Sequence, residues 1–98
     1  MKALTIREIK NQLKLLPNWK YQKGLLQRSF EFSSFKKTIN FLIEVAYIAE
    51  IKNHHPMLIN NFNILEIKLS THDVNGISQK DFDLASDIDD LHLKRSNQ

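Results

Sequence analysis

Between Ser33 and Pro56 the chain carries a long run in which apolar residues recur every three or four positions, the spacing of a helical face. Ser33 and Ser34 supply an N-cap signal, which predicts a helix over residues 34 to 52. Pro56 marks its end, because the residue before a proline avoids helical geometry. The apolar positions are Phe35, Ile39, Leu42, Ile43, Ala46 and Ala49. A helix this apolar must pack against a sheet or another helix.

Alternating apolar and polar residues predict strands on both sides of this helix. A short segment at 19 to 21 precedes a longer one at 25 to 32, and Lys23-Gly24 between them suits a β-hairpin. Arg28 is the charged exception on the apolar side of the longer segment, and we expect it at a sheet edge. Residues 58 to 63 and 64 to 71 predict a second strand pair. The bend between them falls at Asn60-Asn61 or near Asn63, and the spacing leaves both places open.

Two further helices are predicted near the chain ends. Residues 5 to 16 have a helical period, Thr5 and Glu8 resemble a capping box, and Pro17 stops the helix. After the Asn75-Gly76 turn, Ser78 is an N-cap candidate for a last amphipathic helix. The element order is then α-β-β-α-β-β-α. This order predicts a single α+β domain over residues 1–98, with an antiparallel sheet covered on one face by helices.

Composition excludes several classes of protein. The chain has no cysteine, so a disulfide framework, a zinc finger and a thiol nucleophile are ruled out, and we expect a cytoplasmic protein. The net charge of +3 is scattered and the segment 81–90 is acidic, so we expect no nucleic-acid partner. No stretch approaches the roughly 18 apolar residues of a membrane span, so we expect no membrane partner. Because 98 residues cover a sheet thinly, self-association would not be surprising.

Three of the four histidines lie where predicted elements end. His54 and His55 follow the central helix, and His72 follows the last strand. Imidazole transfers protons in both directions near neutral pH, and Asp73 or Asp81 could orient such a histidine by accepting from its second nitrogen. The chemistry therefore favoured is general acid/base catalysis.

Two other interpretations of these histidines stay open on spacing alone. A His-His pair before a proline is also typical of a solvated helix end. A metal site is the other, because Glu50 and His54 are four residues apart and His72 could join them. Adjacent His54 and His55 cannot easily face one ion from regular structure, which weighs against metal.

An ordered set of motifs resembles the pterin-4a-carbinolamine dehydratase family. Glu50 lies four residues before His54-His55-Pro56, Phe62 lies six after Pro56, and Thr71-His72-Asp73 closes a strand. Gly76-Ile77-Ser78 and Asp81 follow at the family's spacing. The resemblance covers roughly residues 19 to 89, and the departures are Leu58, Asn53 and Phe62, where many relatives carry Trp, Asp and Tyr.

The resemblance implies a four-stranded antiparallel sheet with three helices, assembled as a homodimer or homotetramer. It implies a lyase that needs no cofactor and dehydrates a 4a-hydroxytetrahydropterin, in support of tetrahydrobiopterin recycling. His54 and His72 are expected as the acid/base pair and His55 as the residue that positions the substrate. The other residues implied to lie at the pterin are Glu50, Pro56, Thr71, Asp73, Val74 and the supporting Asp81. A non-catalytic pterin-binding module and a dimerisation or coactivator module of the same fold are the alternatives.

Overall fold

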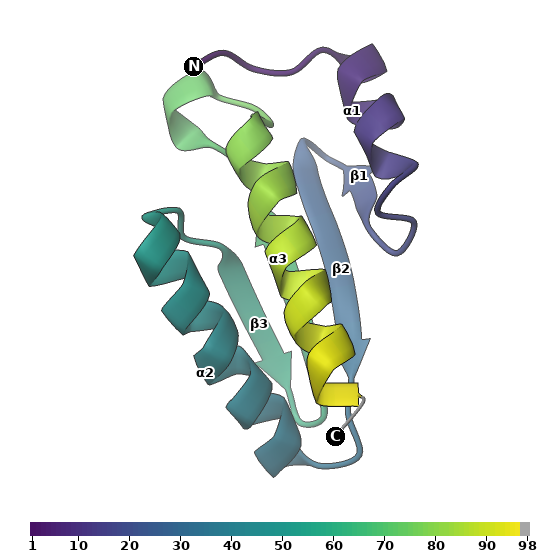
Figure 1. The fold of residues 1–98 in the computed structure, drawn as a ribbon, viewed down its shortest axis with the longest axis vertical. Coiled ribbons are helices and arrows are strands. Elements are labelled where there is room, and N and C mark those ends of the chain that lie inside the picture. Colours follow the sequence, from purple (N-terminus) through teal and green to yellow (C-terminus); the bar gives the residue numbers. More distant parts are fainter. Residues whose placement is uncertain (97–98) are drawn as a thin grey trace.

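The computed structural model describes residues 1–96 and has the predicted order of elements (Figure 1). A single-turn 3₁₀ helix at His72–Val74 precedes the last helix. The elements are α1 (Ile6–Leu13), β1 (Lys20–Gln22), β2 (Leu25–Glu31), α2 (Phe35–Lys52), β3 (Met57–Asn61), β4 (Ile64–Leu69) and α3 (Gln79–Ser96). The capping signals are confirmed, because Thr5 and Glu8 form the reciprocal capping box of α1 and Ser34 caps α2.

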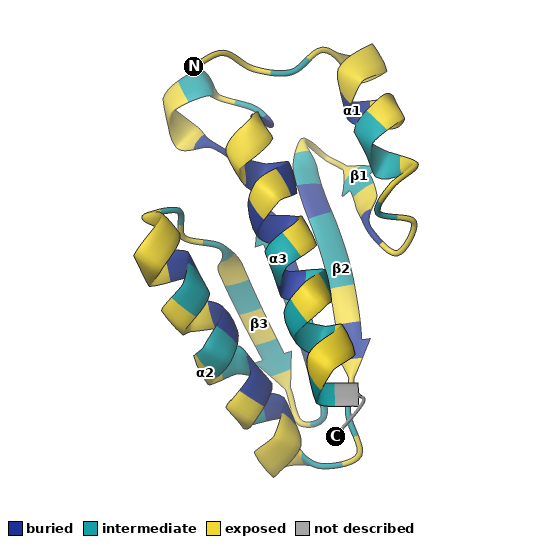
Figure 2. Ribbon diagram, viewed as in Figure 1, coloured by how far each residue is buried: buried dark blue, intermediate teal, exposed yellow. Residues whose placement is uncertain are grey.

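The four strands form one antiparallel sheet in the order β1-β2-β4-β3. Helices cover one face of it, and their sheet-facing sides are buried while their outer sides are exposed (Figure 2). Alternate residues of β4 show the same asymmetry, since Leu65, Ile67 and Leu69 are buried and the residues between them are not. The predicted fold class is therefore confirmed.

Two turns show how local chemistry fixes the register of the strands. Lys23 and Gly24 both have positive φ, 52° and 77°, as the tight hairpin between β1 and β2 requires. The turn between β3 and β4 consists of Phe62 and Asn63, so the second of the two predicted places is correct. Phe62 adopts a φ of 52°, and the Asn60 side-chain amide braces the turn by donating to the carbonyls of Phe62 and Ile64.

Arg28 lies one residue beyond the last pair of β1 with β2, Lys20 with Gln27. It is only partly at an edge, because on its other side it pairs with Ile67 of β4. Its guanidinium turns toward the helices, stacks 4.1 Å from the centre of the Phe30 ring and donates to Asp89 at 2.5 Å. A charged partner on α3, which spacing cannot show, is what accommodates this arginine.

Helices α2 and α3 run antiparallel, and two ion pairs align them. Arg95, near the end of α3, contacts Glu44 in the middle of α2 at 2.5 Å, and Lys52, at the end of α2, contacts Asp87 in the middle of α3 at 2.9 Å. The first turn of α3 therefore lies beyond the end of α2, beside the histidines that follow that helix (Figure 1). None of the helices within residues 1–96 is both long and apolar enough to cross a membrane.

Candidate active site

The end of α2 fixes the position of the two adjacent histidines. Asn53 adopts the left-handed conformation, with φ 52° and ψ 43°, and its N–H donates to the Glu50 carbonyl at 3.1 Å. The His54 N–H reaches back to the Ala49 carbonyl at 3.0 Å. This pair of bonds is the Schellman arrangement, which reverses the chain and satisfies the last carbonyls of the helix. His54 is thereby held by its own backbone directly against the helix end.

The start of α3 is held by hydrogen bonds between side chains and backbone. The Ser78 N–H donates to Asp81 Oδ2 at 2.9 Å, and the Ser78 hydroxyl oxygen accepts from the Lys80 N–H at 3.2 Å. Both Ser78 and Asp81 are fully buried. This exchange is a variant of the capping box and confirms Ser78 as the predicted N-cap. It also places the Asp81 carboxylate at the positive end of the helix, where an anion is favoured.

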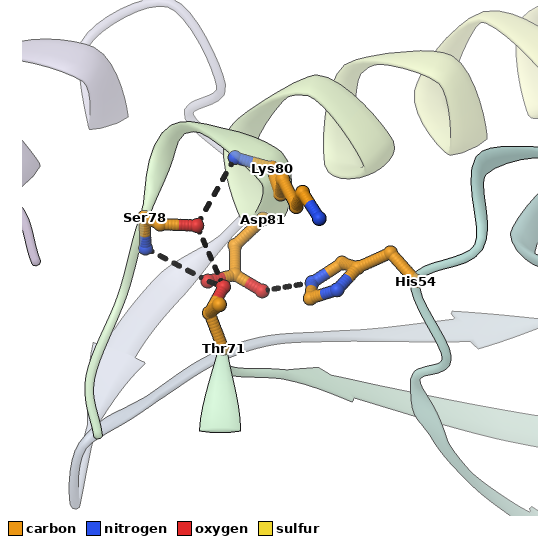
Figure 3. Close-up of polar contacts among 5 residues, drawn as sticks. All are labelled: His54, Thr71, Ser78, Lys80 and Asp81. Carbon is orange, nitrogen blue, oxygen red and sulfur yellow. Dashed lines mark hydrogen bonds and ion pairs between the residues drawn. The ribbon is translucent and has the colours of Figure 1, made fainter. Parts of the chain in front are cut away.

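The carboxylate of Asp81 joins the two elements by contacting His54. Asp81 Oδ1 lies 2.6 Å from His54 Nε2, and Asp81 Oδ2 accepts from the Thr71 hydroxyl at 2.7 Å (Figure 3). Because the single hydroxyl hydrogen of Thr71 goes to Asp81, the 2.7 Å contact between Thr71 and Ser78 has the Ser78 hydroxyl as donor. Every polar group around this buried carboxylate is therefore paired.

This geometry determines which nitrogen of His54 carries the proton. A carboxylate only accepts, so Nε2 is the donor, and in the neutral imidazole Nδ1 is left with a lone pair. Within residues 1–96 no hydrogen bond engages that Nδ1. The side chain is 11% exposed, enough to meet a ligand but not bulk water on all sides. Such a histidine can accept a proton at Nδ1 and become an imidazolium that Asp81 stabilises.

A surface pocket of about 330 Å³ opens in front of His54. The lining residues come from the end of α2, the end of β4, the 3₁₀ turn and the start of α3. They are Asn53, His54, His55, Ser70, Thr71, His72, Asp73 and Lys80. The structure thus brings together the three predicted catalytic histidines with two of the residues predicted to contact substrate, Thr71 and Asp73.

A small turn holds His72 and Asp73 at this pocket. Thr71 and Gly76 form an isolated antiparallel bridge, and the Thr71 N–H donates to the Gly76 carbonyl at 2.7 Å. Between them Asn75 takes a left-handed conformation with φ 54°, which Asn tolerates better than most residues. The turn directs His72 and Asp73 outward, and both are exposed.

Glu50 and His55 form a contact at the rim of the pocket. His55 Nε2 lies 3.2 Å from Glu50 Oε2, and the two side chains are 60% and 77% exposed. Pro56 and Val74 are half-buried and do not belong to the lining formed by the described residues. Their predicted contacts with substrate stay predictions.

The geometry of the described residues bears on the spacing argument that favoured a metal. No group of three His, Asp or Glu side chains within residues 1–96 is arranged to hold an ion. The spacing argument fails because α2 ends at Lys52, so Glu50 and His54 are not one helical turn apart. Each is also engaged elsewhere, Glu50 with His55 and His54 with Asp81.

Sequence reasoning missed three lining residues, Asn53, Ser70 and Lys80, as members of the site. Asn53 had a usable signal, because an Asn directly after a helical period is a common left-handed cap. Lys80 had none, since an exposed lysine in a first helical turn is unremarkable in any sequence. Only the meeting of α2, β4 and α3 places it at the pocket.

Comparisons with known proteins show what this chain is similar to. The sequence model of the family described as pterin 4 alpha carbinolamine dehydratase matches residues 2–91. A relative that carries this family name, from Christiangramia forsetii, is 43% identical over 91 residues, which cover 93% of this chain and 94% of the relative. Another from Sulfurisphaera tokodaii is 38% identical over 93% of this chain and 98% of its own.

Two solved structures share the fold. One, described as a transcriptional coactivator/pterin dehydratase from Brucella melitensis, has a TM-score of 0.86 at 30% identity and covers 90% of this chain and 96% of its own. The other is described as a pterin dehydratase-like protein that is a RuBisCO assembly factor in the alpha-carboxysome. Its TM-score is 0.65 at 25% identity, over 76% of this chain and 88% of its own. On this family match and these identities, the chain belongs to the pterin 4 alpha carbinolamine dehydratase family.

Proposed function

We propose that this chain is a hydro-lyase that converts a 4a-hydroxytetrahydropterin to quinonoid dihydropterin and water, in support of tetrahydrobiopterin recycling. The observation that carries the proposal is the pair of His54 and the buried Asp81, which leaves Nδ1 of the imidazole for a ligand in the pocket. Substrate and product differ only by one water molecule, so the reaction as written needs no redox cofactor. It needs a base and an acid.

The two proton transfers can be assigned to two histidines. The C4a–O bond breaks as N5 loses its proton and its electrons form the new N5–C4a double bond. His54, backed by a carboxylate that stabilises its charged form, takes the N5 proton. His72, on the exposed side of the same pocket, protonates the departing hydroxyl. His55, held by Glu50 at the rim, positions the ring.

The test is stopped-flow absorbance of the dehydration, measured above the spontaneous background. We expect His54→Ala and His72→Ala each to reduce the accelerated rate by about 10²–10⁴-fold, the contribution typical of a positioned acid or base. His92→Phe is the matched control, because His92 packs against Phe30 and Phe41 and lies outside the pocket. Unchanged rates in both alanine variants would refute the assigned roles, and no acceleration by the unmodified protein would refute the function.

A separate feature supports an interaction role for the same chain. Residues at every fourth position give α2 an apolar outer stripe, in which Phe35, Ile43, Tyr47 and Ile51 are between 50% and 68% exposed and Ile39 is half-buried. Few monomeric proteins leave such a continuous apolar surface in water. We propose that two copies pair α2 helices antiparallel about Ile43, because Lys36 and Glu50 then face each other, seven residues before and after that centre.

Sedimentation velocity tests this pairing. We expect the unmodified chain to be a dimer or larger and Ile43→Glu to shift it toward the monomer, while Lys37→Gln, an exposed substitution with the same change in charge on the same helix but away from the stripe, has little effect. A monomeric wild-type chain would contradict the pairing. An assembly without turnover would favour the binding-module alternative over the enzyme.

We also propose a cytoplasmic place of action, which the cysteine-free sequence supports.

A further inference from the structure

Lys80 is a charged residue of the pocket that takes no part in the proposed proton transfers. It lies in the first turn of α3, and of the eight lining residues it is the sole lysine or arginine. Within residues 1–96 its ammonium has no hydrogen-bond or ion-pair partner, although lysines elsewhere on the surface, such as Lys52, do. Figure 3 shows its side chain ending on the side of Asp81 where the His54 ring lies, and both Lys80 and His54 line the pocket.

The fold fixes the origin of this side chain relative to the catalytic histidine. The Lys80 N–H donates to the Ser78 hydroxyl at 3.2 Å, and the next residue, Asp81, holds His54 at 2.6 Å. Lys80 and His54 therefore both line the pocket beside the first turn of α3. A ligand in this pocket of about 330 Å³ can therefore contact the ammonium and the His54 ring at the same time.

The chemistry of the ligand identifies the atom that the ammonium binds, on the condition that the proposed function holds. An ammonium has three donors and no acceptor, so it cannot bind the 2-amino and N3–H groups of a pterin, which are donors themselves. Two acceptors adjoin the reacting C4a: the departing 4a-hydroxyl, which is assigned to His72, and the C4 carbonyl oxygen. We propose that Lys80 is a substrate-binding and specificity-determining residue that donates to the C4 carbonyl oxygen.

Recognition of this kind has a consequence for substrate choice. An acceptor adjacent to the reacting carbon is common to all 4-oxo pterins, whereas the C6 substituent lies on the other ring. Lys80 therefore selects for the 4-oxo group and not for the C6 side chain.

The experiment is a residue-by-ligand cycle that measures binding without turnover. Pterin and 2-aminopteridine, which lacks the C4 oxygen, are titrated by fluorescence against the unmodified protein, Lys80→Met and Lys80→Arg. Lys94→Met is the matched control, an exposed lysine near the other end of the same helix. We expect Lys80→Met to weaken pterin binding about tenfold, as loss of a hydrogen bond to a charged group does, and to leave 2-aminopteridine binding unchanged. Lys80→Arg should restore most of the affinity, and Lys94→Met should behave as the unmodified protein.

Each other outcome has a definite meaning. An equal loss of affinity for both ligands would show that Lys80 does not bind the C4 oxygen. Dependence on Lys80 for 6-carboxypterin but not for pterin would overturn the assignment and place the lysine at the C6 substituent. If the unmodified protein binds neither pteridine, the proposed function fails first. If pterin binds equally well to the unmodified protein and to Lys80→Met, the proposed function stands and the role of Lys80 is refuted.

Discussion

Replacing Asp81 by Asn should change the tautomer of His54 while preserving the shape of the site. The new side chain has one acceptor oxygen, and two donors, Thr71 Oγ1 and the Ser78 N–H, already converge on Asp81 Oδ2. The oxygen should stay with them, so the amide NH₂ faces His54 Nε2 and becomes the donor. The imidazole proton then moves to Nδ1, and the pocket meets an N–H in place of a lone pair.

The magnitude follows from what is lost and what is kept. A base that presents the wrong nitrogen no longer contributes its share of catalysis, so we expect turnover to fall about 10²–10⁴-fold. The folded state loses the charge-assisted bond to His54 but keeps those to Thr71 and Ser78, which should cost about 1–2 kcal/mol. For a domain of this size that corresponds to a fall in Tm of very roughly 4–16 °C.

The assay combines the stopped-flow rate with ¹⁵N NMR of the histidine side chains. The two ring nitrogens of His54 should exchange their protonated and unprotonated shifts in Asp81→Asn. Asp90→Asn serves as the control, since Asp90 is an exposed acid on the same helix and outside the pocket. A folded Asp81→Asn protein with the unmodified rate would refute the reasoning, and so would a rate loss without the change of tautomer.

Two further predictions concern the helix end and the pH dependence of stability. Asn53→Gly should be close to neutral in urea unfolding and Asn53→Ala should cost about 1 kcal/mol, because glycine and asparagine tolerate the φ of 52° found at Asn53 better than alanine does. Equal stabilities of the two variants would show that this left-handed cap is unimportant. Burial, followed by the nearby charge of Arg28, lowers the pKa of His92 below its ordinary 6.5, although Asp89 opposes this. The folded state then binds fewer protons than the unfolded one, so stability is lost as pH falls through and below 6.5. Urea unfolding at pH 7.5 and 5.5 should show a smaller loss in His92→Phe, and an identical loss in both proteins would show that His92 is not responsible.

The elements could be predicted from sequence because their signals are local. Capping boxes, hairpin turns and the change from helical to alternating period depend on residues within four positions of one another. The turn at Phe62 was harder to locate, because a phenylalanine with positive φ offers no compositional signal and competes with three nearby asparagines.

The same distinction between local and distant contacts applies to the site. The sequence suggested that Asp73 or Asp81 could orient a histidine, but it could not decide which acid meets which ring. That choice depends on the antiparallel alignment of α2 and α3, which ion pairs between distant residues support. The same dependence on distant contacts explains why Arg28 pairs with Asp89 instead of lying at a solvent-exposed edge. It also explains why the sequence did not indicate Lys80 as a member of the site. Local sequence patterns do not predict contacts between residues 27 or more positions apart, such as the contact of His54 with Asp81.

Asp81 belongs at once to the helix cap and to the histidine pair, and this limits what its presence can diagnose. A chain of this fold that had abandoned proton transfer would still need an acceptor for the Ser78 N–H at the start of α3. An acid at this position is therefore weak evidence of activity when sequences from the family are sorted by function. The informative positions are those of His54 and His72, whose side chains are not needed to begin or end a helix.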